Sequence, residues 1–147
     1  MFEIIVTFGT VPEVPAGHKK YKRHNDTLVV YSYNRKPDEW DAPELIYRNF
    51  CLHELIRADT LYVYVGDVEQ ACITREQSWL LVRRILKDLN GHKKEVVVVT
   101  SFEELDPESR EKECHEAQVL GVRVVELKGV SAEKFFVDIF RKYRPGV

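Results

Sequence analysis

The sequence predicts one α/β domain over residues 1–147, a Rossmann-like, three-layer α/β/α sandwich. We expect a mostly parallel sheet of about five strands with about four helices. Short runs rich in β-branched residues alternate along the chain with longer stretches of helical periodicity. Most stretches between two runs are long enough for the crossover that joins two parallel strands.

Five short apolar runs predict the strands. Four consecutive valines at residues 96–99 are apolar on both faces, which a strand inside a parallel sheet requires. The predicted strands are residues 2–7, 27–33, 60–65, 95–100 and 122–127. No helix is predicted between the first two runs, so the first strand can join the sheet in either direction.

Capping residues and apolar spacing predict the helices. Asp41 with Glu44, and Thr74 with Gln77, have the spacing of a capping box, in which two side chains satisfy exposed backbone N–H groups. The predicted helices are residues 41–57, 74–90, 106–121 and 131–143. The third has few apolar residues and is expected at the surface.

Composition excludes several classes of protein. The formal net charge of −2 excludes a generally basic nucleic-acid coat, although a local basic patch is compatible with it. Three cysteines without CxxC spacing favour reduced thiols and a cytoplasmic location. No apolar run is long enough for a membrane span, and we expect no signal peptide. We expect no metal, because His53-Glu54 is followed by Arg57 where a zinc-protease signature needs histidine.

Polar residues follow the predicted strands at their carboxyl ends, where open parallel sheets bind ligands. Small and hydroxyl-bearing side chains at this edge suit phosphate or ribose groups. The predicted ligand-binding residues are Gly9, Thr10, Asn34, Arg35, Gly66, Thr100 and Ser101. The alternative for Gly9 is that it only allows the chain to turn after the first strand. The alternative for Arg35 is that it lies in an exposed polar turn without a ligand.

Two carboxylates, Asp67 and Glu69, follow the third predicted strand. They are the acidic residues best placed for general-base chemistry or a ribose contact. The alternative is an acidic loop in front of a helix, which the helix dipole favours.

Residues 10–26 form the longest predicted loop. Its basic residues surround a single aromatic, Tyr21; they are Lys19, Lys20, Lys22 and Arg23. Such a loop can close over an anionic ligand or contact a nucleic-acid backbone. A solvated surface loop or a β-hairpin extension is the alternative.

Paired tyrosines alternate along two predicted strands, Tyr31 with Tyr33 and Tyr62 with Tyr64. Each pair projects to one face of the sheet. The pattern predicts either core packing under helices or a contact between two copies in a homodimer.

Two resemblances extend these expectations. Residues 4–10, with the Gly9-Thr10 turn, resemble the start of the CRISPR-associated Rossmann-type domains that sense cyclic oligoadenylates. The small size and β-α alternation resemble nucleoside deoxyribosyltransferases and TIR-like glycosidases, which need a glutamate presented on a helix. Both rest on fold-level pattern.

The sequence therefore favours a small-ligand binding domain for a nucleotide or another phosphate-bearing molecule at the strand ends. A nucleoside- or nucleotide-processing hydrolase or glycosidase using Asp67 or Glu69 is one alternative. A non-catalytic homodimer that contacts nucleic acid through residues 18–24 is the other.

Overall fold

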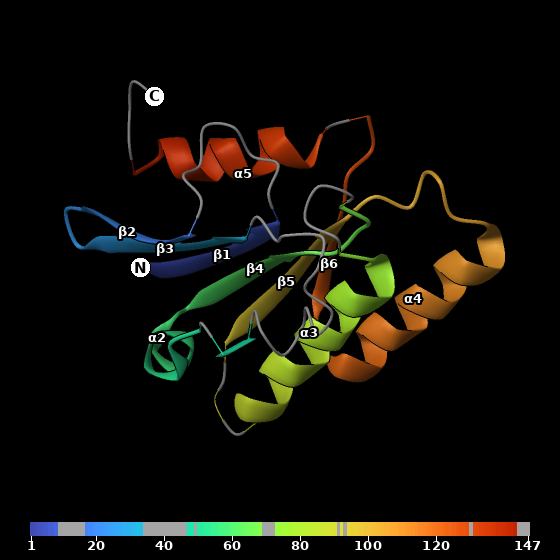
Figure 1. Ribbon diagram of the computed structural model, residues 1–147, viewed down its shortest axis with the longest axis horizontal. Helices are drawn as coiled ribbons and strands as arrows, with labels where there is room; N and C mark the ends of the chain where they lie inside the picture. Colours follow the sequence, from blue (N-terminus) through green and yellow to red (C-terminus); the bar gives the residue numbers. More distant parts are fainter. Residues whose placement is uncertain are drawn as a thin grey trace.

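The computed structural model in Figure 1 is a mixed α/β fold built on one sheet. It describes residues 1–8, 17–33, 47–48, 50–68, 73–90, 92, 94–129 and 131–143. The described strands are β1 (Phe2–Phe8), β2 (Gly17–Arg23), β3 (Asp26–Tyr33), β4 (Thr60–Tyr64), β5 (Glu95–Thr100) and β6 (Arg123–Glu126). The described helices are α2 (Leu52–Arg57), α3 (Arg75–Asp88), α4 (Pro107–Leu120) and α5 (Ala132–Arg141).

The six-stranded sheet has the order β2-β3-β1-β4-β5-β6. Strand β1 lies between β3 and β4 and runs parallel to both, which settles the direction that the sequence left open. β4, β5 and β6 continue the parallel sheet, so the predicted α/β class with a mostly parallel sheet is confirmed. Strands β3 and β4 are consecutive along the chain but lie on opposite sides of β1. The strand order therefore reverses at β1.

The sixth strand, β2, corrects one prediction. The basic residues expected in a loop, Lys19, Lys20, Lys22 and Arg23, lie on this strand, which pairs antiparallel with β3 over its whole length. The hairpin turns at His24, whose φ of 57° lies in the left-handed region. The β-hairpin alternative is therefore the correct one for residues 17–33.

Helices cover the sheet unequally (Figure 1). Helices α2, α3 and α4 lie on one face, and among the described helices α5 alone lies on the other. The valines of β5 alternate between the two cores: Val96 and Val98 face α3, and Val97 and Val99 face α5. The predicted helix–sheet–helix layering therefore follows from the apolar pattern of the strands.

Local capping signals gave most helix ends correctly. Thr74 and Gln77 form the predicted capping box at the start of α3. The side chain of Asp106 accepts a hydrogen bond from Ser109 N at the start of α4, and Gly121 ends that helix with a φ of 73°. As predicted, α4 lies at the surface, with Ala117 its only described residue that is fully buried.

The prediction of one continuous first helix is wrong. A single helix over residues 41–57 was expected, but Cys51 has extended backbone and the described helix α2 begins only after it. The expected cap Asp41 and its partner Glu44 lie outside the described residues.

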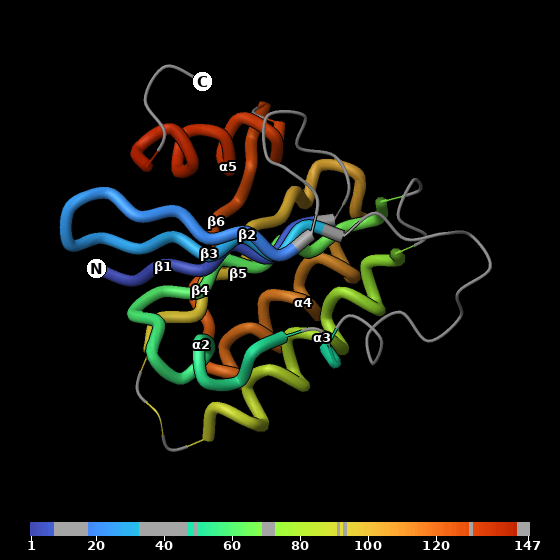
Figure 2. Tube along the Cα trace, turned by 60° about the vertical axis from the view of Figure 1, so that its left-hand side comes forward, coloured from blue at the N-terminus to red at the C-terminus, as the bar shows by residue number. Residues whose placement is uncertain are grey.

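A polar cluster attaches the β2–β3 hairpin to α2. The imidazole of His18 stacks on the ring of Tyr31, with centroids 4.5 Å apart, and its Nε2 lies 2.9 Å from the Glu54 carboxylate. The Tyr31 hydroxyl donates to the same carboxylate and accepts a hydrogen bond from Cys51 N at 3.1 Å. Figure 2 shows the hairpin lying along the edge of the sheet.

The tyrosines whose side chains are described pack under helices. Tyr31 is fully buried, and the rings of Tyr62 and Tyr64 lie edge-on to Phe135 and Phe136 of α5. The core alternative therefore holds for these three, and a homodimer stays a prediction. In the described part of the chain, no helix is long and apolar enough to cross a membrane.

Candidate ligand-binding site

A cavity of about 250 Å³ lies at the carboxyl ends of β4 and β5. It stands one strand from the point where the strand order reverses, the region where open α/β sheets bind ligands. Its lining residues are Tyr64, Gly66, Asp67, Arg75, Ser101, Glu103, Glu104 and Leu105. We refer to it as the strand-end cavity.

The floor of the cavity is held by hydrogen bonds between the two strand ends. The backbone N–H of Val65 donates to Val99 O, and the buried Thr100 hydroxyl donates to Val65 O at 2.7 Å. Ser78 of α3 donates from its hydroxyl to Gly66 O. These bonds leave the loops after β4 and β5 fixed at their bases.

The Tyr64 ring folds closely over Gly66. A Cβ at position 66 would lie 2.5 Å from the Tyr64 hydroxyl oxygen, closer than van der Waals contact permits. Burial raises the pKa of Tyr64; Arg75 lowers it, and Asp67 and Glu104 raise it further. The phenol therefore stays protonated at neutral pH and can donate a hydrogen bond into the cavity.

Asp67 has a structural contact at the start of α3. Its Oδ1 accepts a hydrogen bond from the backbone N–H of Arg75 at 2.8 Å, in the first turn of the helix. This anion therefore occupies the positive end of the α3 dipole. Its partner in the predicted general-base pair, Glu69, lies outside the described residues.

The guanidinium of Arg75 forms one wall. Its Nε donates to Glu113 at 2.6 Å and its Nη1 to Ser101 O at 3.0 Å, and its Cζ lies 5.5 Å from the Phe102 ring centroid. Trp79 donates to the other oxygen of Glu113. The buried Nη2 has no partner among the described residues. Glu113 therefore neutralises the charge of Arg75 and fixes its orientation.

Three carboxylates line the cavity, those of Asp67, Glu103 and Glu104. Glu103 accepts a hydrogen bond from Gly129 N at 2.8 Å through one oxygen. With Arg75 already paired, the cavity has an excess of negative charge. It offers mainly hydrogen-bond acceptors, which suit a ligand rich in N–H and O–H groups.

The structure brings three predicted residues, Gly66, Asp67 and Ser101, to this cavity. Thr100 lies beneath it, fully buried, with its hydroxyl bound to the backbone of β4. The other predicted ligand-binding residues lie outside the described residues; they are Gly9, Thr10, Asn34 and Arg35. The four basic residues of β2 do not line the cavity.

Sequence reasoning missed Tyr64, Arg75, Glu103 and Glu104. The two glutamates follow Thr100-Ser101 after a single residue, Phe102, so the strand-end rule could have included them. Arg75 and Tyr64 had no such signal, because their roles depend on contacts with Glu113 and Gly66. Within the described ranges, no group of three or more His, Cys, Asp or Glu side chains could hold a metal ion.

No protein-family profile matches the chain, and no curated protein matches it in sequence. Solved structures with a similar arrangement include the FeoB G-domain from Methanococcus jannaschii, at 13% identity and a TM-score of 0.44 over 97% of this chain and 98% of that one. The cytosolic domain of the T. maritima FeoB iron transporter in a GDP form aligns at 15% identity and a TM-score of 0.40, over 100% of this chain and 65% of that one. At such scores the likeness supports no argument about the ligand of this protein.

Proposed function

We propose that the protein is a small-ligand binding domain that takes a nucleoside or nucleotide at the strand-end cavity. The observation that supports this most is a cavity at the carboxyl ends of β4 and β5 lined by three carboxylates, a phenol and a serine. Carboxylates accept hydrogen bonds from ribose hydroxyls and from the amino groups of bases. The acceptor-rich lining matches those donor groups.

The charge of the cavity refines the sequence prediction of a phosphate site. Asp67, Glu103 and Glu104 repel phosphate, and Arg75 is already paired with Glu113. The sugar and base therefore occupy the strand-end cavity, and any phosphate lies away from it. Nucleosides are thus expected to bind at least as tightly as their phosphorylated forms.

Calorimetry with a panel of nucleosides and nucleotides tests this proposal. The variant Asp67→Asn with Glu104→Gln removes two charges but keeps the hydrogen bond at the start of α3, because the asparagine side-chain oxygen also accepts from Arg75 N. We expect it to weaken nucleoside binding at least about tenfold, the cost of about one charged hydrogen bond. The control, Glu108→Gln with Glu111→Gln, removes two charges from the exposed side of α4 and should bind like the wild type.

Two results would contradict the proposal. One is the absence of binding by every nucleoside and nucleotide at millimolar concentration. The other is an affinity that rises with each added phosphate and is competed by inorganic phosphate, because that behaviour requires a cationic site.

A further inference from the structure

Strand β2 has an unusual concentration of positive charge. Four of its seven residues are lysine or arginine, and none is acidic. The side chains of Lys19, Lys20 and Lys22 are exposed and pair with no carboxylate among the described residues. Four arginines elsewhere are neutralised in ion pairs: Arg75–Glu113, Arg83–Glu116, Arg110–Glu126 and Arg123–Glu95. In the described part of the chain, no carboxylate therefore neutralises these three lysines.

The charge of β2 reaches both faces of the sheet edge. Successive side chains of a strand alternate in direction. Lys20 and Lys22 share the face of His18, which stacks on Tyr31. Lys19 and Arg23 share the face of Tyr21, whose ring packs edge-on against Phe140 of α5 at 4.9 Å.

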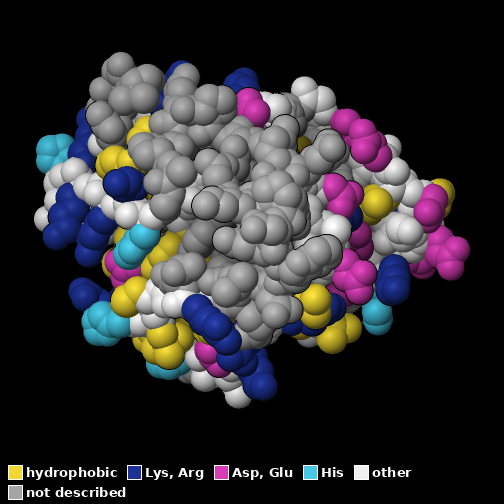
Figure 3. Space-filling model, in the orientation of Figure 1, with side chains coloured by type: hydrophobic (Ala, Val, Ile, Leu, Met, Phe, Trp, Pro, Cys, Tyr) yellow, Lys and Arg dark blue, Asp and Glu magenta, His cyan; other side chains and the backbone are white. Residues whose placement is uncertain are grey.

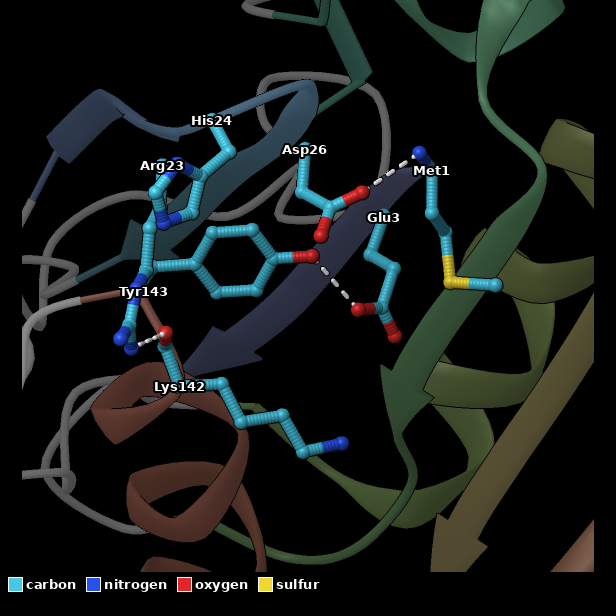
Figure 4. Close-up of a pocket in the computed structure, with 7 residues that line it drawn as sticks. All are labelled: Met1, Glu3, Arg23, His24, Asp26, Lys142 and Tyr143. Atoms are coloured by element: carbon cyan, nitrogen blue, oxygen red, sulfur yellow. Dashed lines mark hydrogen bonds and ion pairs between the residues drawn. The ribbon is translucent and has the colours of Figure 1, made fainter.

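A second cavity, of about 380 Å³, continues the basic strand at the turn of the hairpin (Figure 4). Arg23 and His24 enter it from the hairpin and Lys142 from the end of α5. Arg23 donates from Nη1 to the backbone oxygen of Lys142 at 2.8 Å, which joins the hairpin to the end of α5 beside this cavity.

The carboxylates of this second cavity already have partners. Glu3 is 5% exposed and accepts a hydrogen bond from the Tyr143 hydroxyl at 2.6 Å. Asp26 pairs with the amino group of Met1 at 2.7 Å. Neither acid forms an ion pair with Arg23 or Lys142 in the described part of the chain. We call Lys19, Lys20, Lys22, Arg23, His24 and Lys142 together the basic edge.

Charge is unevenly distributed over the face of the molecule in Figure 3. Lysine and arginine side chains gather at the left of this view, over the hairpin, and at the bottom, and most acidic side chains lie at the right, over α4. Such segregation gives a protein with a net charge of −2 one face that attracts polyanions.

We propose that the basic edge binds the phosphate backbone of duplex nucleic acid without reading its sequence. A regular polyanion matches a row of lysines on a strand followed by a cationic cavity. A single strand fits less well, because its binding sites normally offer aromatic rings on which bases stack. Here Tyr21 packs on Phe140, and Tyr31 and Tyr143 are buried.

Lysines on an edge strand also have a purely protective role, since they discourage pairing with strands of other molecules. That role does not require the charge to continue beyond the strand. The continuation through Arg23, His24 and Lys142 into the second cavity is what favours a ligand.

Fluorescence anisotropy with a labelled duplex of about 20 base pairs tests the proposal, between about 50 and 200 mM salt. Contacts from about four cations predict a slope near −3.5 for log K against log salt, with micromolar or weaker affinity. The triple variant Lys19→Gln, Lys20→Gln, Lys22→Gln should lose at least about tenfold at the lowest salt and flatten the slope by about 2.7. The control triple variant is Lys87→Gln, Lys112→Gln, Lys128→Gln, which makes the same change in net charge on exposed residues away from the hairpin.

The control variant should keep the wild-type slope, and both variants should keep the wild-type urea midpoint. The proposal is overturned if the wild type does not bind duplex at the lowest salt, or if the control loses as much affinity as the test variant. Tighter binding of a single strand than of a duplex of equal length overturns the choice of partner. Binding to phosphatidylserine vesicles without binding to duplex overturns it in favour of a membrane surface.

Discussion

The hydroxyl of Tyr31 is a single group whose removal should measurably weaken the fold. It lies in a fully buried side chain, donates to Glu54 and accepts a hydrogen bond from Cys51 N at 3.1 Å. Tyr31→Phe keeps the ring that stacks on His18 but leaves the Cys51 N–H without this acceptor. The loss of one hydrogen bond to a charged group and one neutral one should cost about 2–3 kcal/mol of unfolding free energy.

Urea denaturation measures this cost directly. With a slope of about 2 kcal/mol per molar urea for a domain of this size, the midpoint of Tyr31→Phe should fall by about 1 M. A double-mutant cycle with Glu54→Gln should show that the two changes are not additive, because both act on the hydrogen bond between Tyr31 and residue 54. A loss below about 0.5 kcal/mol, the size of an ordinary surface change, would refute this reasoning.

The same hydroxyl makes a prediction at high pH. Burial first, and then the hydrogen bond to Glu54, raise the pKa of Tyr31 above its ordinary value of 10.0. Its protonated form therefore stabilises the fold fully below pH 10, and that contribution is lost as the pH rises towards the raised pKa. The difference in stability between wild type and Tyr31→Phe should shrink by about 1.4 kcal/mol per pH unit above pH 10. A constant difference between pH 10 and pH 11 would contradict the assignment.

Three further variants test other contacts by urea denaturation. Thr74→Ala removes the cap of α3 and should cost about 1 kcal/mol, whereas Thr74→Ser should cost little; equal losses would exclude the capping box as the cause. Gly66→Ala should displace the Tyr64 ring and cost about 1–3 kcal/mol, and unchanged NMR shifts of that ring would show that the close approach is absent. Tyr143→Phe removes the donor to buried Glu3 and should cost about 1.5–3 kcal/mol; burial, and next this bond, raise the Tyr143 pKa, so the loss should shrink above pH 10. If Tyr143→Phe lowers the unfolding free energy by the same amount at every pH, the link between this hydrogen bond and the raised pKa is contradicted.

Local signals were sufficient for much of the fold. The cap at Thr74, the Asp106-Pro107 start and the Gly121 stop each depend on residues a few positions apart, so the sequence alone places the ends of α3 and α4. The valine run of β5 indicates an interior strand because both of its faces need apolar cover.

Non-local contacts explain the errors. Strand β2 has no apolar alternation beyond Tyr21, because it is an edge strand whose pairing with β3 needs no buried face. The expected first helix is interrupted at Cys51, whose N–H donates to the Tyr31 hydroxyl, twenty positions earlier in the chain. No local pattern shows that contact.

The position of the candidate site follows from the rule that ligands bind at the carboxyl ends of parallel strands, whereas its chemistry depends on the charges that line it. The carboxyl ends of parallel strands meet at one edge, so Gly66, Asp67 and Ser101 could be predicted to lie together. The neutralisation of Arg75 by Glu113, 38 positions away, could not be predicted. That pair changes the expected chemistry from a phosphate site to an acceptor-rich one.

NMR titration of the ¹⁵N-labelled protein with guanosine, adenosine, cytidine and uridine tests the central claim most directly. If the strand-end cavity binds the nucleoside, amide shifts should change around Gly66, Asp67 and Glu104 and stay constant along Lys19 and Lys20. The Asp67→Asn, Glu104→Gln variant should lose those changes. Shift changes confined to other parts of the chain, or none for all four nucleosides at millimolar concentration, would contradict the account.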